Sequence, residues 1–170
     1  PGCISGTLWS GLLPTRHRGL MAKFAGFEIR SADYTVDLPL LRQIREHVFV
    51  KEQQVPLTLE WDAIDPDCWH VLAIDEKGLA IGTGRLTPQR TIGRMAVLSE
   101  WRGKGVGHAL LLQLIALAKA KQWPEVSLHA QISARDFYKK HGFVAYGPIY
   151  REAGIEHQSM RLDLTAQATD

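Results

Sequence analysis

The chain has 170 residues, of which 45% are apolar, 22% charged and 8% aromatic, so it is unlike collagen, a disordered tract or a disulfide scaffold. It carries 20 Lys and Arg against 18 Asp and Glu, and residues 1–20 hold two arginines and no acid, which leaves no net charge on the remainder. We therefore expect neither nucleic acid nor a membrane as a partner. The two cysteines, Cys3 and Cys68, favour a reducing compartment, so we predict a cytoplasmic location.

Residues 1–20 differ in composition from the rest of the chain. They are rich in Gly and Pro, contain no acid and precede Met21. No long apolar segment follows a basic start, which argues against a signal peptide. We expect a tag or other non-native extension here and a single domain over residues 21–170; the alternative is a native extension that packs on that domain.

The hydrophobic pattern then predicts a compact α/β domain. Its strands are expected at residues 27–30, 69–74, 79–86, 92–98, 126–130, 143–146 and 157–164. Helices are expected at residues 38–53, from the glycine-rich stretch to about Lys121, and at residues 134–140. Asp37 and Pro39 suit the start of the first helix as cap and first turn. An acidic loop is expected between residues 57 and 68, and a meander of strands followed by alternating helices implies a mixed sheet with helices on both faces.

The segment that links the third long strand to the next helix is the most informative. Three glycines alternate in it, and glycine backbones can turn their N–H groups towards an anion beside a helix N-terminus. Neither the P-loop pattern nor the dinucleotide fingerprint fits, because Gly105 follows Lys104 and because His108 and Leu110 stand where a last glycine is required. The segment therefore predicts a diphosphate site of another kind, or a glycine-rich connection without a ligand.

Two motifs in order resemble the GNAT superfamily of N-acetyltransferases. Arg102-x-x-Gly105-x-Gly107 resembles its R/Q-x-x-G-x-G/A signature, and residues 134–143 resemble its A-x-x-x-Y-x-K-x-G-F segment. The resemblance covers about residues 27 to 164. A narrower resemblance, to the ElaA-like subgroup, rests on features such as Glu52-Gln53-x-Val55-Pro56 and Gly82-Thr83-x-Arg85-Leu86.

The resemblance implies a GNAT fold whose sheet splays between the strands at 92–98 and 126–130 to admit acetyl-CoA. It implies cofactor contacts from the strand at residues 92–98, from the glycine-rich loop and from the second motif. These residues are Met95, Ala96, Val97, Arg102, Gly103, Lys104, Gly105, Val106, Gly107, Gln131 and Tyr138. Gln131 departs from the family, which commonly has Asn there, but glutamine offers the same amide one methylene farther out.

The resemblance also implies direct transfer of an acetyl group to a primary amine, with Tyr138 as general acid. Glu60 is the base that we favour, while Asp62, His70 and His129 are alternatives, and each histidine also suits a purely structural role. The acids at residues 60–67 form either a solvated loop or, if functional, a site for a cationic acceptor. Cys68-Trp69-His70 lacks a second ligand pair, so no metal is expected.

The resemblance implies a small-molecule or peptide amine as the acceptor, without identifying it; it leaves the oligomeric state open, with a homodimer as one possibility. The competing hypothesis is a non-catalytic domain that binds CoA as a sensor or scaffold.

Overall fold

The computed structural model describes residues 21–165, so the predicted extension at residues 1–20 lies outside the described residues. The strands are β1 (Ala22–Phe24), β2 (Phe27–Ala32), β3 (Trp69–Asp75), β4 (Ala80–Leu86), β5 (Thr91–Val97), β6 (Glu125–Gln131), β7 (Val144–Glu152) and β8 (Ile155–Asp163). They form one sheet in the order β1-β2-β3-β4-β5-β6-β8-β7. Only β5 and β6 are parallel neighbours; the other pairs are antiparallel. The predicted mixed, mostly antiparallel sheet is confirmed.

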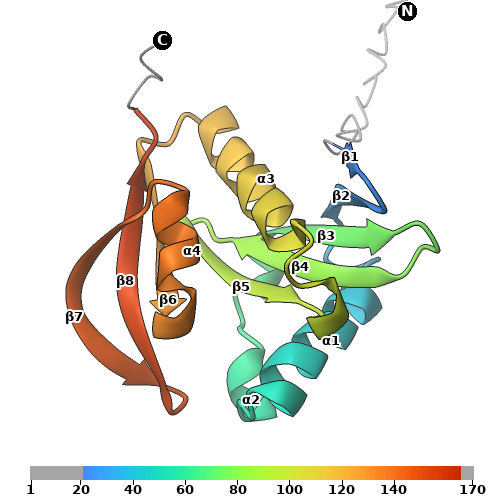
Figure 1. The fold of residues 1–170 in the computed structure, drawn as a ribbon, viewed down its shortest axis with the longest axis horizontal. Coiled ribbons are helices and arrows are strands. Elements are labelled where there is room, and N and C mark those ends of the chain that lie inside the picture. Colours follow the sequence, from blue (N-terminus) through green and yellow to red (C-terminus); the bar gives the residue numbers. More distant parts are fainter. Residues whose placement is uncertain (1–20, 166–170) are drawn as a thin grey trace, which may run out of the picture.

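Helices pack on both faces of this sheet. The helical segments are α1 (Leu38–Arg45), the π-helix η1 (Glu46–Glu52), α2 (Leu57–Glu60), α3 (Val106–Ala120), α4 (Arg135–Lys140) and the short 3₁₀ turns η2 (Asp65–Asp67), η3 (Ser99–Trp101) and η4 (Ile132–Ala134). Figure 1 shows α3 on one side of the sheet and α1 on the other. The alternation along β3 explains this arrangement, because Val71 packs in the core under α3 while Leu72 packs against α1. None of the helices within residues 21–165 is long and apolar enough to cross a membrane.

The first helix differs from the prediction in two ways. The expected helix over residues 38–53 changes from α-helix to π-helix at Glu46, and the N–H of Gln53 bonds to the carbonyl of Val48, five residues back. Asp37 occupies the cap position, but the expected side-chain cap bond is absent. Its carboxylate instead pairs with Arg30 at 2.8 Å and accepts a hydrogen bond from the N–H of Asp33.

Two strands differ from the prediction: β1 was not expected, and β7 is longer than expected. β1 has only three residues, too few for an alternating pattern to reveal it. β7, expected only at residues 143–146, continues through Gly147 and Pro148 to Glu152, and its register with β8 shifts between Tyr146 and Ile149. The β7–β8 hairpin is therefore longer than predicted.

The sheet parts between β5 and β6. These strands share only the pairs Thr91–Ser127 and Ile92–Leu128, whereas β6 pairs with β8 along its whole length. Beyond these two pairs the strands are unpaired with each other, as the splay between residues 92–98 and 126–130 requires. This confirms the predicted fold and opens a space in the middle of the sheet.

Candidate active site

A cleft of about 640 Å³ lies where β5 and β6 separate. Its walls come from η1, α2, β5, β6, α4 and the β7–β8 turn. Six of the residues expected to contact the cofactor line it: Met95, Ala96, Val97, Arg102, Gln131 and Tyr138. Glu60, the favoured base, lines it as well. The fold thus brings side chains from both halves of the sequence to one cavity.

A β-bulge shapes the wall formed by β5. Arg85 pairs with Gly93 and Thr83 with Ala96, so β5 has one more residue than β4 between these two pairs. Arg94, within the bulge, has a φ of +50°, a left-handed conformation that is unusual for a residue other than glycine. A bulge disrupts the ladder and redirects backbone groups. Here it does so directly before the segment expected to hold the thioester.

The glycine-rich loop is an exposed turn that leads into α3. Gly103 and Gly105 have φ values of +73° and +84°, and a Cβ on either glycine would meet no atom within 4 Å. The glycines are therefore needed for backbone conformation rather than for space. The hydrogen bonds that define α3 begin at the N–H of Ala109, which bonds to the carbonyl of Gly105, so the amides of residues 106–108 precede it. Such a turn suits a diphosphate.

The two basic side chains of this loop lie differently. Arg102 lines the cleft; its Nε donates to the carbonyl of Val97 at 2.9 Å and its Nη2 pairs with Glu52 at 2.7 Å. The Nζ of Lys104 lies 5.0 Å from the centre of the Trp101 ring, and its side chain is outside the lining of the cleft. Of the two basic residues of the loop, Arg102 is thus the one that lies at the cleft.

Tyr138 extends from α4 into the cleft. Its ring packs at right angles to those of Phe137 and Phe143, with centroids 5.1 and 5.9 Å away. Burial raises the pKa of Tyr138 to about 12, so the hydroxyl keeps its proton at neutral pH. This arrangement suits a hydrogen-bond or proton donor.

Gln131 is bonded across the cleft. Its Nε2 donates to Oε1 of Gln53 at 2.8 Å, which joins β6 to the residue that ends the π-helix. The amide of Gln131 therefore lies in the cleft, as the family position requires, and its partner is a residue that the sequence did not single out as a cleft residue.

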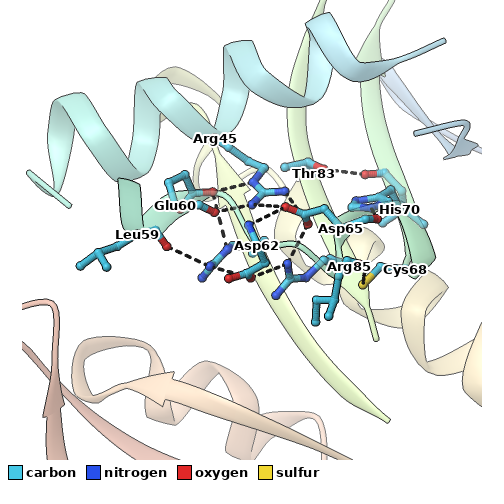
Figure 2. A network of polar contacts seen from close by, with 12 residues as sticks. Arg45, Leu59, Glu60, Asp62, Asp65, Cys68, His70, Thr83 and Arg85 are labelled. Carbon is cyan, nitrogen blue, oxygen red and sulfur yellow. Dashed lines mark hydrogen bonds and ion pairs between the residues drawn. The ribbon is translucent and has the colours of Figure 1, made fainter. Parts of the chain in front are cut away.

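Glu60 belongs to a buried charge network, shown in Figure 2. Its carboxylate accepts from Nε of Arg45 at 2.5 Å, and Asp65 accepts from Nη1 of Arg45 at 2.9 Å and from Nη1 of Arg85 at 2.7 Å. The side chains of Arg45, Glu60 and Asp65 are no more than 2% exposed. Asp62 is 35% exposed and accepts from both Arg85 and Arg94.

This network corrects the expectation of a solvated acidic loop. The segment expected as a loop contains the helical turns α2 and η2. Three arginines neutralise its carboxylates at residues 60, 62 and 65. The expectation of a cationic acceptor assumed that these carboxylates carry an uncompensated negative charge. Because the arginines compensate that charge, the acidic residues no longer support a cationic acceptor. Burial raises the pKa of Glu60, and the neighbouring Arg45 opposes only part of this effect.

The two histidines considered as bases have different surroundings. His70 is buried outside the cleft, its Nε2 is 2.8 Å from the carbonyl oxygen of Asp65, and burial lowers its pKa. His129 lines the cleft and its Nδ1 bonds to the hydroxyl of Tyr150. His129 therefore remains a candidate by position, whereas His70 supports the loop.

Cys68 is a free thiol outside the lining of the cleft. It bonds to the carbonyl of Ile64 at 3.2 Å, and burial raises its pKa. Within the described part of the chain, no three His, Cys, Asp or Glu side chains gather as a metal site would require.

Comparisons with known proteins agree with this geometry. The acetyltransferase (GNAT) domain family matches residues 43–164. The uncharacterised N-acetyltransferase YjcF of Bacillus subtilis is 36% identical over 123 residues, which cover 71% of this chain and 88% of YjcF. An acyl-CoA N-acyltransferase from Pseudomonas aeruginosa is 32% identical, with a TM-score of 0.71 and coverage of 80% of this chain and 99% of that one. Escherichia coli ElaA is 27% identical, with a TM-score of 0.72 and coverage of 81% and 99%, which confirms the narrower resemblance.

Proposed function

This chain belongs to the acetyltransferase (GNAT) domain family, and on that premise we propose that it transfers the acetyl group of acetyl-CoA directly to a primary amine. The observation that carries the proposal is the parting of β5 from β6 over a cleft whose lining extends to Arg102, the residue before the glycine turn that leads into α3. The turn offers backbone N–H groups to the diphosphate, and Arg102 adds a positive charge. The bulged strand offers backbone groups at residues 95–97 to the pantetheine arm and to the thioester carbonyl.

In the reaction, the amine nitrogen forms a bond to the thioester carbonyl carbon and the bond from that carbon to sulfur breaks. The charge that develops on the carbonyl oxygen is stabilised by a backbone N–H of β5. The sulfur leaves as a thiolate that Tyr138 hydrogen-bonds or protonates, and the amine loses one proton to a base. No covalent enzyme intermediate is needed.

We assign the role of base to Glu60, acting through water, because its side chain is only 2% exposed and bonded to Arg45. It lines the cleft, and burial raises its pKa, which makes a carboxylate a stronger base. Glu60→Gln should lower kcat by about 10²-fold and remove the rise of the rate with pH that accompanies deprotonation of Glu60. A larger loss in His129→Asn, with Glu60→Gln near the wild-type rate, would transfer the role to His129.

The whole proposal is tested by incubating the protein with acetyl-CoA and a panel of amines and measuring turnover as the release of the CoA thiol. Tyr138→Phe should lower kcat by about 10²-fold and leave the Kd for CoA, measured by calorimetry, nearly unchanged. Tyr146→Phe is the matched control, because Tyr146 is an exposed tyrosine of β7 outside the cleft lining.

Three outcomes would contradict the proposal in different ways. An unchanged kcat in Tyr138→Phe removes this residue from the mechanism. CoA binding without turnover of any amine favours the sensor or scaffold domain. Absence of CoA binding contradicts the CoA site itself.

A further inference from the structure

The charge network has donors that the chain itself does not use. Arg45 bonds through all three of its nitrogens, to Glu60 and to Asp65, and is fully buried. Arg85, by contrast, bonds only through Nη1, and Arg94 only through Nη2. The Nε atoms of both are buried and have no hydrogen-bond partner among residues 21–165, although Nε of Arg94 lies 3.6 Å from Oε1 of Glu60 as an ion pair. Buried donors without a partner cost free energy, so they call for an explanation.

Of the three arginines in the charge network, Arg85 and Arg94 face the cleft. Both line it, whereas Arg45 does not. The Arg85 side chain is only 8% exposed, yet its Nη2 lies on the side of Gly93, where an added Cβ would come within 3.9 Å. The Nε and Nη2 groups of an arginine form a planar fork that matches the two oxygens of a carboxylate.

Arg85 and Arg94 meet the cleft beside one partly exposed carboxylate. Glu60 and Asp65 are held by Arg45 and nearly inaccessible, so the more exposed carboxylate beside Arg85 and Arg94 is Asp62. One oxygen of Asp62 already accepts from both arginines, at 2.7 and 2.9 Å. A carboxylate oxygen of this chain thus occupies the space between the two guanidinium groups, and Arg94, whose side chain is 27% exposed, keeps guanidinium surface for one more anion.

The backbone at Arg94 adds an independent observation. A left-handed conformation is unfavourable for a residue other than glycine, and the bulge holds Arg94 in it, at φ +50°. Such strain persists where it serves to place a side chain, and here it directs the guanidinium towards α2, where Nη2 lies 3.3 Å from the carbonyl oxygen of Leu59.

We propose that the acceptor is a small amine that carries a carboxylate, and that Arg94 and Arg85 bind this carboxylate. The inference rests on the proposed acetyl transfer. Arg94 directly precedes Met95, where the thioester site is expected to begin, and adjacent Cα atoms are about 3.8 Å apart. The carboxylate and the reacting amine would therefore lie in the same cleft, and the three probe lengths below test the spacing between them.

Calorimetry with the protein saturated with CoA tests this without turnover. The probes are glycine, β-alanine and 4-aminobutanoate, each compared with its own amide. At least one acid should bind about tenfold or more tightly than its amide, the effect of a charge-assisted hydrogen bond. This ratio should fall to about one in Arg94→Gln and to an intermediate value in Arg94→Lys, which keeps the charge and loses the fork.

Arg90→Gln is the matched control, since Arg90 is an exposed arginine of the β4–β5 turn outside the cleft lining, and it should leave the ratio unchanged. Equal binding of acids and amides to the wild-type protein overturns the inference whatever the variants do. Faster acetylation of the amides or of peptide lysines also overturns it and leaves the acetyl transfer standing. Failure of CoA itself to bind counts against the proposed function instead.

Discussion

Asp65 anchors two arginine side chains at once, although its own carboxylate is fully buried. Burial alone would raise its pKa, but the hydrogen bonds from Arg45 and Arg85 outweigh that effect and lower the pKa to about 2. An unfolded aspartate titrates near 3.8. The network therefore stabilises the folded state above that pH, and this contribution is lost as the pH falls towards 2.

Asp65→Asn should lower the free energy of unfolding at pH 7 by about 3 kcal/mol, because Arg45 and Arg85 lose the anion between them. Between pH 4 and pH 2 the wild type should lose about 2 kcal/mol more than the variant, which has no proton to take up at this position. Urea unfolding followed by tryptophan fluorescence measures both quantities. Asp67→Asn, two residues away and exposed, should behave as the wild type; equal acid sensitivity of all three proteins would refute the account.

At the scale of elements, the glycines that contact or begin α3 serve two different purposes. Within β4, a Cβ on Gly82 would lie 3.0 Å from the carbonyl oxygen of Ala96, and one on Gly84 would lie 2.8 Å from the Leu114 side chain of α3. These glycines let α3 lie close to the sheet. Gly103 and Gly105, in contrast, provide the turn that begins α3, where space is not limiting.

Gly105→Ala should therefore separate folding from binding. The left-handed backbone makes alanine unfavourable by about 1 kcal/mol, while distortion of the turn removes hydrogen bonds to the diphosphate and should raise the Kd for CoA about tenfold or more. Gly78→Ala is matched to it, because Gly78 has a φ of +81°, equally open surroundings and a place in the β3–β4 turn. It should lose similar stability with an unchanged Kd. Equal Kd values in the two variants would show that the glycine turn does not bind CoA.

For the molecule as a whole, local patterns predicted most of the fold. Alternation and helical periodicity located β3, β4, β6 and α3 to within a few residues, because each depends on neighbours in the sequence. The two family motifs located the cleft. Its residue contacts still need functional tests, and the cytoplasmic location and the homodimer remain predictions.

The charge network could not be predicted in this way. Arg45 is separated by 15 residues from Glu60 and by 20 from Asp65, so an acid-rich segment looked exposed when it was in fact neutralised from a distant helix. The left-handed Arg94 had no signal either, since the bulge arises from the mismatch between two strands rather than from β5 alone. Long-range pairing decided both features.

Gln53 and Gln131 also determine the free-energy cost of leaving the cleft without a cofactor. Both amides are half-buried, and they bond to each other across the two walls. Left unbonded, such groups would cost about 1–3 kcal/mol each. An amide both donates and accepts, so each can release the other and take the amides of an arriving pantetheine arm in exchange. If CoA binds as proposed, its arrival would exchange one set of hydrogen bonds for an equivalent one, so the cleft would need no collapse or opening at this pair.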